Sequence, residues 1–169
     1  MSYERFTAST KKVIDLANDE AQRLGHGCVG TEHILVGIIQ EGNGVAAEAL
    51  DNLTISLEDV QDEVGKVTPC GPVVTKKGTD LPVSRAAKVA IIAALDESLR
   101  LHDAHIGTEH ILLGIVGNKH DVASTVLMNL GHKLDEVRDE TLFLIAQGPE
   151  TAAERKSRKA SQRKKHDAA

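Results

Sequence analysis

Aromatic residues, cysteine and long apolar runs are scarce in this sequence, and each scarcity excludes a class of protein. Only 2% of the 169 residues are aromatic, and Leu, Ile, Val and Ala supply most of the 41% that are apolar. Such a core suits packed helices better than a β-sandwich, so we expect an all-α fold. No apolar run could span a bilayer and no stretch resembles a signal peptide, which predicts a cytoplasmic protein without a membrane partner. Cys28 and Cys70 lie in unlike contexts and are expected to be reduced thiols.

Motifs for catalysis and for cofactor binding are missing as well. The sequence has no G-x-S-x-G, no H-E-x-x-H, no glycine-rich strand-to-helix turn and no phosphate-binding loop. We therefore predict that the chain is not an enzyme, needs no cofactor and does not hydrolyse ATP. A metal-dependent hydrolase using His and Glu residues is the least favoured alternative.

The feature that organises the chain is an internal repeat around the sequence Gly-Thr-Glu-His-Ile-Leu. This sequence occurs at residues 30–35 and again at 107–112, at an offset of 77. At the same offset residues 6–66 align with 83–143 without a gap, and 24 of the 61 pairs are identical. In a chain of this length the two copies must share one core.

Apolar residues at helical spacing, together with capping residues, predict four helices in each copy. Thr7 is the expected N-cap of the first helix, Thr31 of the second and Ser56 of the fourth. In the second copy helices are expected near 84–101, 108–116, 122–130 and 133–146, with Asp121 as the N-cap of the third. The predicted fold is an all-α, eight-helix bundle of two pseudo-twofold-related four-helix repeats.

The predicted organisation is one domain over residues 1–147, followed by a flexible basic tail over 148–169. Repeat one spans 6–67, a linker containing Pro and Gly spans 68–82, and repeat two spans 83–147. The tail lacks large apolar residues, although the run from Glu154 to Lys165 could form a transient or bound helix. Residues 150–169 carry 7 Lys/Arg and 3 Asp/Glu, a net charge of +4, whereas residues 1–149 carry 13 and 22, a net charge of -9. The two parts should therefore attract different partners.

One aligned position predicts a difference between the repeats. Gly131 can adopt the left-handed conformation after the third helix of repeat two, whereas the matching residue, Thr54, is β-branched and disfavours a positive φ. We therefore expect the third helix to end differently in the two repeats.

The repeated Gly-Thr-Glu-His sequence carries the candidate polar site. Glu32 and Glu109 are expected at the first helical position, where a carboxylate complements the helix dipole. His33 and His110 are expected to pack or form hydrogen bonds at the joint between helices. No metal site is expected, because a histidine pair without a third ligand nearby in sequence is weak support for one.

Several motifs, in order and at matching spacing, give the chain a resemblance to a known family. They are Arg5-Phe6-Thr7, Leu24-Gly25-His26, the two Gly-Thr-Glu-His-Ile-Leu sequences and Glu41-Gly42-Asn43-Gly44-Val45-Ala46-Ala47. From residue 3 to about 147 the sequence resembles the double Clp repeat domain at the N-terminus of ClpC-type AAA+ unfoldases. The resemblance implies a module that receives substrates and adaptor proteins for an unfoldase coupled to the Clp protease. Since the AAA+ modules are absent, it implies an excised domain or a stand-alone Clp-repeat protein.

The resemblance also implies a ligand, because ClpC-type domains bind phosphorylated arginine, a degradation mark. By resemblance, Glu32 and Glu109 would hold the guanidinium, while Thr7 and Ser84 with their neighbouring amides would hold the phosphate. Carboxylates pair well with guanidinium groups, and helix N-termini attract anions. Repeat two departs from the family at Pro82-Val83-Ser84-Arg85, where an aromatic residue followed by Thr is usual, so we expect its site to be the altered one. The competing interpretation gives both glutamates a purely structural role.

We therefore expect a non-catalytic binding module of the Clp system, acting as an accessory or regulator that recognises proteins marked for degradation. Its expected partners are a ClpC-type unfoldase or its adaptors, and arginine-phosphorylated or unfolded substrates. The alternative is a nucleic-acid- or ribosome-associated stress protein that binds through its basic tail. Nucleic acid is not expected elsewhere, and the tail lacks aromatic residues for base stacking.

Overall fold

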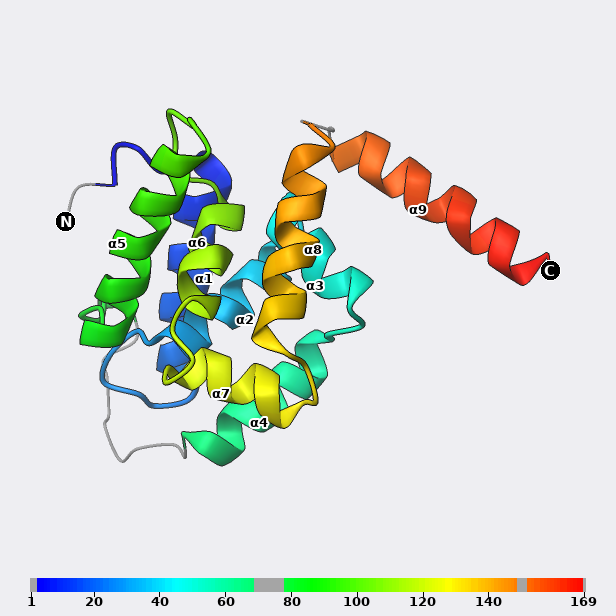
Figure 1. Cartoon of the computed structure of the whole chain (residues 1–169). Helices are drawn as coiled ribbons and strands as arrows, with labels where there is room; N and C mark the ends of the chain where they lie inside the picture. Colours follow the sequence, from blue (N-terminus) through cyan, green and yellow to red (C-terminus); the bar gives the residue numbers. More distant parts are fainter. Residues whose placement is uncertain (1–2, 69–77, 149–151, 169) are drawn as a thin grey trace.

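The computed structural model describes residues 3–68, 78–148 and 152–168, and these residues form nine α-helices (Figure 1). Repeat one contains α1 (Ala8–Arg23), α2 (Thr31–Glu41), α3 (Val45–Asn52) and α4 (Leu57–Val67). Repeat two contains α5 (Arg85–Arg100), α6 (Thr108–Val116), α7 (Val122–Asn129) and α8 (Leu134–Ala146). The predicted all-α fold is confirmed, and every helix of repeat two begins and ends within one residue of its predicted bounds. Cys70 and most of the predicted linker lie outside the described residues.

In each repeat the first helix packs closely against the second, α1 on α2 and α5 on α6. Glycines make this approach possible. A Cβ atom on Gly37 would lie 2.6 Å from the carbonyl oxygen of Val13, and one on Gly114 would lie 2.3 Å from that of Ala90. Both distances are shorter than any van der Waals contact, so only glycine fits where the helices cross.

The two repeats share one core because helices of one pack on helices of the other. α2 and α4 contact α7, while α3 contacts α6 and α8 (Figure 1). Leu35 and its counterpart Leu112 are fully buried, as are Leu50 and its counterpart Leu127. The aliphatic composition thus forms a single interior to which both copies contribute matching side chains.

The start of each repeat is hydrogen-bonded to the loop before the second helix of the other repeat. The amide of Thr7 donates to the carbonyl of Ile106 at 3.1 Å, and the amide of Ile106 donates to the carbonyl of Arg5 at 2.7 Å. In the equivalent place the amide of Ser84 donates to the carbonyl of Val29 at 2.9 Å. We call these two places the crossed junctions. Each brings a Gly-Thr-Glu-His sequence next to the first helix of the opposite repeat.

The expectation that the third helix ends differently in the two repeats is wrong. Thr54 adopts a φ of 61°, in the same left-handed region as Gly131 at 89°. Both ends are closed by the same kind of hydrogen bond: Ile55 N donates to Leu50 O at 2.9 Å, and its counterpart in repeat two donates to Leu127 O at 3.0 Å. The packing of the helix end overrides the preference of a β-branched residue, so Thr54 is strained.

The basic tail contains α9 (Ala152–Asp167), which covers the run for which the sequence left a helix open. α9 projects from the bundle beyond the end of α8 (Figure 1). Arg158 and Lys159 form ion pairs with Glu48 and Asp51 of α3, while every other described α9 side chain is exposed. Among its described side chains, α9 is therefore attached by charge and not by an apolar interface. Among the described residues, no helix combines the length and apolar character needed to cross a membrane.

Replacing Gly114 with alanine should weaken the α5–α6 crossing, because the new methyl group collides with the Ala90 carbonyl. We expect Gly114→Ala to lower the free energy of unfolding by roughly 1–3 kcal/mol, as overpacking does. Urea unfolding followed by circular dichroism measures this. Gly65→Ala is the matched control, since a Cβ on Gly65 in α4 meets nothing within 4 Å. Its higher helix propensity should raise stability by about 0.5–1 kcal/mol, and equal losses in both variants would contradict the steric explanation.

Relieving the strain at Thr54 should stabilise the protein, because its exposed side chain has little packing to lose. We expect Thr54→Gly to raise the free energy of unfolding by about 0.5–1 kcal/mol, after allowing for the entropy of glycine in the unfolded chain. The reciprocal change, Gly131→Thr, should lower it. Thermal unfolding of both variants provides the comparison, and a destabilised Thr54→Gly protein would show that the conformation is not strained.

Candidate functional site

The second helix of each repeat begins with the same hydrogen-bonded turn. The amide of Gly30 donates to Nδ1 of His33 at 2.8 Å, and the amide of Gly107 donates to Nδ1 of His110 at 2.9 Å. The glycine is therefore the N-cap residue, and the histidine ring supplies the acceptor that satisfies its amide. This explains why both histidines are fully buried at the start of a helix.

The prediction that Thr31 caps α2 is wrong, because its hydroxyl is bonded to the other repeat. Thr31 Oγ1 donates to Asp121 Oδ1 at 2.5 Å. Asp121 caps α7 as predicted, and its Oδ1 also accepts from the amide of Val122 at 2.7 Å. Thr31 is the first helical residue, so Glu32 and His33 lie one position later in the helix than predicted. The Asp121 carboxylate is shared by two helix N-termini, and both helix dipoles favour it.

The two glutamates of the repeated sequence fold back over the glycines that precede them. A Cβ on Gly30 would lie 2.3 Å from Oε2 of Glu32, and one on Gly107 would lie 2.4 Å from Oε1 of Glu109. Each carboxylate thus occupies the space that a side chain before the helix would take. The Glu32 side chain is 9% exposed and that of Glu109 is 25% exposed, so the latter is the more accessible.

The four predicted site residues lie in two pairs that cross between the repeats. The hydrogen bond from Ser84 to Val29 brings the start of α5 next to the N-terminus of α2, and the bond from Thr7 to Ile106 brings α1 next to α6. We call these places the Glu32 site (Glu32, Gly30 and Ser84) and the Glu109 site (Glu109, Gly107 and Thr7).

The crossing corrects the expectation about repeat two. The unusual start Pro82-Val83-Ser84-Arg85 belongs to repeat two in the chain, but it lies at the Glu32 site and not at the Glu109 site. The departure therefore affects the site whose glutamate comes from repeat one. Order along the chain does not reveal this, because the pairing is made between the repeats.

Each site also contains the N-terminus of a 16-residue helix. Thr7 Oγ1 accepts from the amide of Thr10 at 3.2 Å, and Ser84 Oγ accepts from the amide of Ala87 at 3.1 Å. The amides that precede these capped ones point out of the helix end, where a negative group is favoured. A carboxylate and an anion-attracting helix end are thus adjacent in both sites.

Burial shifts the pKa of the Glu32 carboxyl. Loss of solvent raises the pKa of Glu32, a backbone hydrogen bond opposes this, and the nearby Asp121 carboxylate raises it again. A buried carboxylate in this position is stabilised when a cation replaces the missing solvent. The Glu32 site is therefore suited to a cationic group with hydrogen-bond donors, such as a guanidinium.

His33 belongs to a chain of hydrogen bonds that reaches the end of α4. Since Nδ1 of His33 accepts from Gly30, its neutral ring carries the proton on Nε2, which donates to Nδ1 of His26 at 2.7 Å. Nε2 of His26 then donates to the carbonyl of Thr68 at 3.1 Å. Each ring nitrogen in this chain has one partner and a defined role.

Among the described residues, His26, Glu32 and His33 are placed so that their ligand atoms lie within 4.8 Å of one another. The hydrogen-bond chain disfavours a metal there, because the proton on His33 Nε2 occupies the position of the lone pair that would face the ion. Repeat two has the same arrangement with Asp103, which accepts from Nε2 of His110 at 2.9 Å. The hydrogen-bonding role predicted for the histidines is confirmed, and the absence of a metal stays a prediction.

Two contacts of the site were not predicted from the sequence. The partners of His33 and His110 could have been found in the sequence. In both repeats a hydrogen-bonding side chain, His26 or Asp103, stands seven residues before the histidine. The contact between Thr31 and Asp121 had no comparable signal in the sequence. The residue that matches Asp121 in repeat one is Gly44, which has no carboxylate.

Comparison with known proteins shows which family has this architecture. The family model for the Clp repeat (R) N-terminal domain matches residues 5–130 and 86–166. The chain belongs to this family. Chaperone protein ClpB of Oceanobacillus iheyensis is 41% identical over 162 residues, which are 96% of this chain and 20% of that protein. The negative regulator of genetic competence ClpC/MecB of Bacillus subtilis is 41% identical over 145 residues, 86% of this chain and 18% of that protein. The Clp repeat chain thus spans about a fifth of the length of these relatives.

Solved structures confirm the fold of the Clp repeat chain. The N-terminal domain of ClpD from Arabidopsis thaliana superposes with a TM-score of 0.69 at 23% identity, covering 86% of this chain and 97% of that one. The Hsp104 N-terminal domain from Candida albicans gives a TM-score of 0.70 at 17% identity, covering 88% and 95%. The resemblance seen in the sequence motifs is therefore confirmed at the level of family and fold.

The burial of His33 predicts a loss of stability in mild acid. Burial, with a smaller contribution from His26 and against the effect of Glu20, lowers the pKa of His33 from 6.5 to about 4. Because the folded value is the lower one, the unfolded chain binds the proton more tightly. The stability that neutral His33 contributes is complete above pH 6.5 and is lost as the pH falls from 6.5 towards 4.

His33→Gln tests this, because the glutamine oxygen can still accept from Gly30 but does not titrate. We expect the variant to abolish roughly 2 kcal/mol of the stability loss that the natural protein shows between about pH 7 and about pH 5. Urea unfolding at both pH values measures the difference. The control is His105→Gln, at an exposed loop position, which should keep the natural pH dependence. An unchanged pH dependence in His33→Gln would refute the assignment.

Proposed function

We propose that this Clp repeat chain is a non-catalytic binding module of a Clp unfoldase-protease system, and that it recognises proteins marked by phosphorylated arginine. The observation that supports this is the crossed arrangement of its two sites. In each, a glutamate from one repeat lies beside the N-terminus of the first helix of the other repeat. An acidic group and an anion-attracting helix end in one place match the two ends of a phosphoguanidinium group.

Recognition in such a site depends on both ends of the ligand. The planar guanidinium pairs with the glutamate carboxylate through charge-assisted hydrogen bonds. The phosphate accepts from the outward-pointing amides at the start of α1 or α5, where the helix dipole favours negative charge. Arginine without phosphate, or phosphate without guanidinium, satisfies only half of the site. Selectivity for the modified side chain follows from this geometry.

The two sites should differ in how readily they bind. The Glu109 side chain is the more exposed and lies beside Thr7, at the start of α1. The Glu32 side chain is almost fully buried and its raised pKa reflects the cost of its charge. A ligand at the Glu32 site must move the Glu32 carboxylate away from Gly30, which opposes binding. The same ligand gives the carboxylate a cationic partner, which favours binding. We therefore expect two sites of unequal affinity, with the Glu109 site filled first.

A module of this kind would deliver marked or unfolded substrates, or the adaptors that carry them, to a ClpC-type unfoldase. It needs only reversible binding, and the proposed sites contain no activated nucleophile and no acid–base pair arranged for catalysis. The glutamates, the helix ends and the backbone amides all act by holding charge. The chemistry of degradation would belong to the partner protease.

Calorimetric titration with free phosphoarginine tests the proposal, with arginine and inorganic phosphate as separate controls. We expect saturable binding to two sites in the natural chain and to one site in Glu32→Ala or Glu109→Ala. Glu58→Ala, which removes an exposed carboxylate from the first turn of α4, should keep both sites. No binding at millimolar ligand would leave the glutamates with a structural role only.

The crossed pairing makes a sharper prediction for double variants. Glu32→Ala with Ser84→Ala damages one site only, so one ligand should still bind. Glu32→Ala with Thr7→Ala damages both sites, so binding should be lost. Each cap replacement costs about 1 kcal/mol of stability, and circular dichroism confirms that the variants fold. The same stoichiometry in both double variants would contradict the crossed sites.

A further inference from the structure

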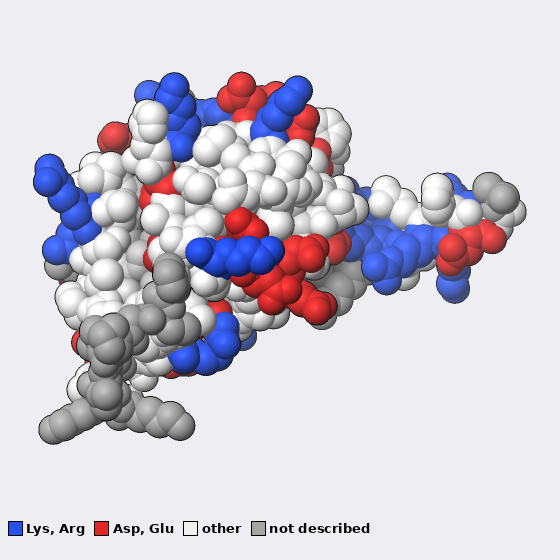
Figure 2. Space-filling model, turned by 90° about the horizontal axis from the view of Figure 1, so that it is seen from below, with Lys and Arg blue, Asp and Glu red and all other residues white. Residues whose placement is uncertain are grey.

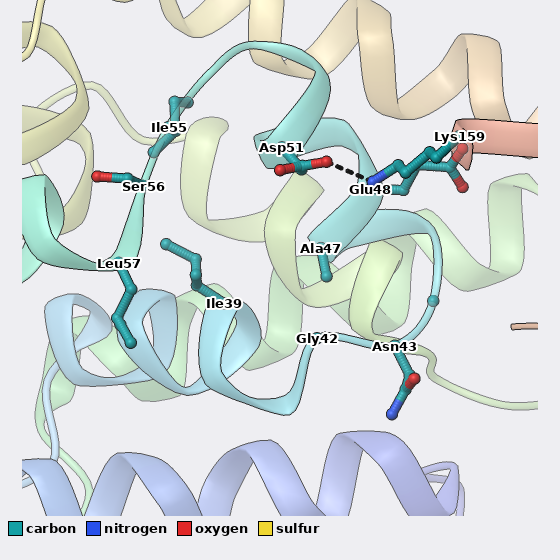
Figure 3. A pocket seen from close by; sticks show the side chains of 11 residues that line it. Ile39, Gly42, Asn43, Ala47, Glu48, Asp51, Ile55, Ser56, Leu57 and Lys159 are labelled. Carbon is teal, nitrogen blue, oxygen red and sulfur yellow. Dashed lines mark hydrogen bonds and ion pairs between the residues drawn. The ribbon is translucent and has the colours of Figure 1, made fainter. Parts of the chain in front are cut away.

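A groove on repeat one lies outside both glutamate sites, between α2, α3 and α4 (Figure 3). Its cavity of about 460 Å³ has an apolar floor that includes Ile39, Ile55 and Leu57. Glu48 and Asp51 of α3 form one edge. Figure 3 shows Ile39, Ile55 and Leu57 on the opposite side of the groove from Glu48. We call the feature the acidic groove.

The basic helix α9 occupies the edge of the acidic groove but not its floor. Arg158 pairs with Glu48, whose side chain is only 4% exposed, and Lys159 pairs with Asp51 at the mouth of the cavity. A carboxylate as buried as Glu48 requires a cationic or hydrogen-bonding partner. α9 supplies this charge, yet its sequence contains no large apolar residue. The floor is therefore left without an apolar side chain from α9 to fill it.

The matching groove of repeat two has the opposite charge. It encloses about 860 Å³, its lining includes two lysines, Lys119 and Lys133, against one carboxylate, Asp135, and Met128 stands at the position that corresponds to Asp51. The Clp repeat fold thus forms this hollow twice, but only in repeat one does the third helix contribute carboxylates to it. In Figure 2 the charged side chains of the projecting α9 segment are mostly blue, whereas a group of acidic side chains lies on the body of the molecule. Charge complementarity, and not shape alone, distinguishes the acidic groove.

We propose that the acidic groove is a docking site for a basic segment of a partner protein, one that presents an arginine or lysine next to a large apolar residue. The cation pairs with Glu48 and Asp51, and the apolar side chain fills the floor between Ile39 and Leu57. α9 satisfies the first requirement only, so it acts as an internal competitor that the partner displaces. Nucleic acid is not the occupant, because the two carboxylates repel phosphates.

A peptide derived from α9 tests the proposal with a defined probe. The probe is a fluorescent peptide of residues 152–167 carrying Lys159→Leu, which keeps Arg158 for Glu48 and places a leucine at the mouth of the cavity. Fluorescence anisotropy with the full chain at low salt should show saturable binding. The unmodified α9 peptide should bind more weakly, because it offers nothing to the apolar floor.

Three variants of the full chain separate the contributions. Glu48→Gln with Asp51→Asn should weaken probe binding by about tenfold, because both ion-pair acceptors lose their charge. Asp51→Asn alone, at a position whose side chain is 61% exposed, should weaken it without a risk to folding. Arg158→Ala with Lys159→Ala should strengthen binding by about fivefold, because the internal competitor no longer holds the edge.

The groove of repeat two and the glutamate sites supply matched controls. Lys133→Ala should leave probe binding unchanged, as should Glu32→Ala with Glu109→Ala, so the result does not depend on phosphoarginine recognition. A probe with Arg158→Glu should fail to bind. Equal affinity of the natural and Glu48→Gln/Asp51→Asn chains, or no gain on releasing α9, would overturn the proposal.

Discussion

The backbone hydrogen bonds from Thr7 to Ile106 and from Ser84 to Val29 are the constraint on which the candidate sites of this Clp repeat chain depend. They tie the start of each repeat to the loop that precedes the second helix of the other. Because of this exchange, neither repeat by itself brings its Gly-Thr-Glu-His glutamate next to the N-terminus of a first helix, α1 or α5. The proposed binding function therefore requires the complete pair of repeats, and the interface that stabilises the fold is also the one that assembles the sites.

The polar groups at these junctions are held under unusual restraint. The glutamate carboxylate lies against a glycine, the histidine ring caps that glycine, and a second polar side chain takes the remaining ring proton. In repeat one the restraint is strongest, since burial raises the pKa of Glu32 and lowers that of His33. Both shifts disfavour the charged forms of these two side chains. A cationic ligand would lower the raised pKa of Glu32. The proposed binding function is therefore connected to the stability of the junction.

The two repeats are alike at positions in the core and differ at positions on the surface. Leu50 and Leu127 are buried in equivalent places, and the third helices end in the same left-handed conformation although one ends on Thr54 and the other on glycine. Close packing allows few alternatives at such positions. At the edges of the two grooves Asp51, its counterpart Met128, Lys119 and Lys133 are exposed and free of this constraint, so the two grooves differ in charge. The proposed docking surface arises from that freedom, and the glutamate sites arise from the constrained junctions.

Local patterns in the sequence determined the helices, most of their caps and the existence of two equivalent units, because helical periodicity and capping act over a few residues. The repeated Gly-Thr-Glu-His sequence also identified the glutamates and histidines of the site. Only the tertiary structure decided which helix start meets which glutamate, because that pairing is made by contacts between residues 99 positions apart (Thr7 and Ile106) and 55 positions apart (Ser84 and Val29). It likewise gave the Thr31 hydroxyl to Asp121 instead of its own helix, and imposed a positive φ on Thr54 against its preference. In each case a contact between the repeats, or the packing of a helix end, outweighs a local preference of about 1 kcal/mol.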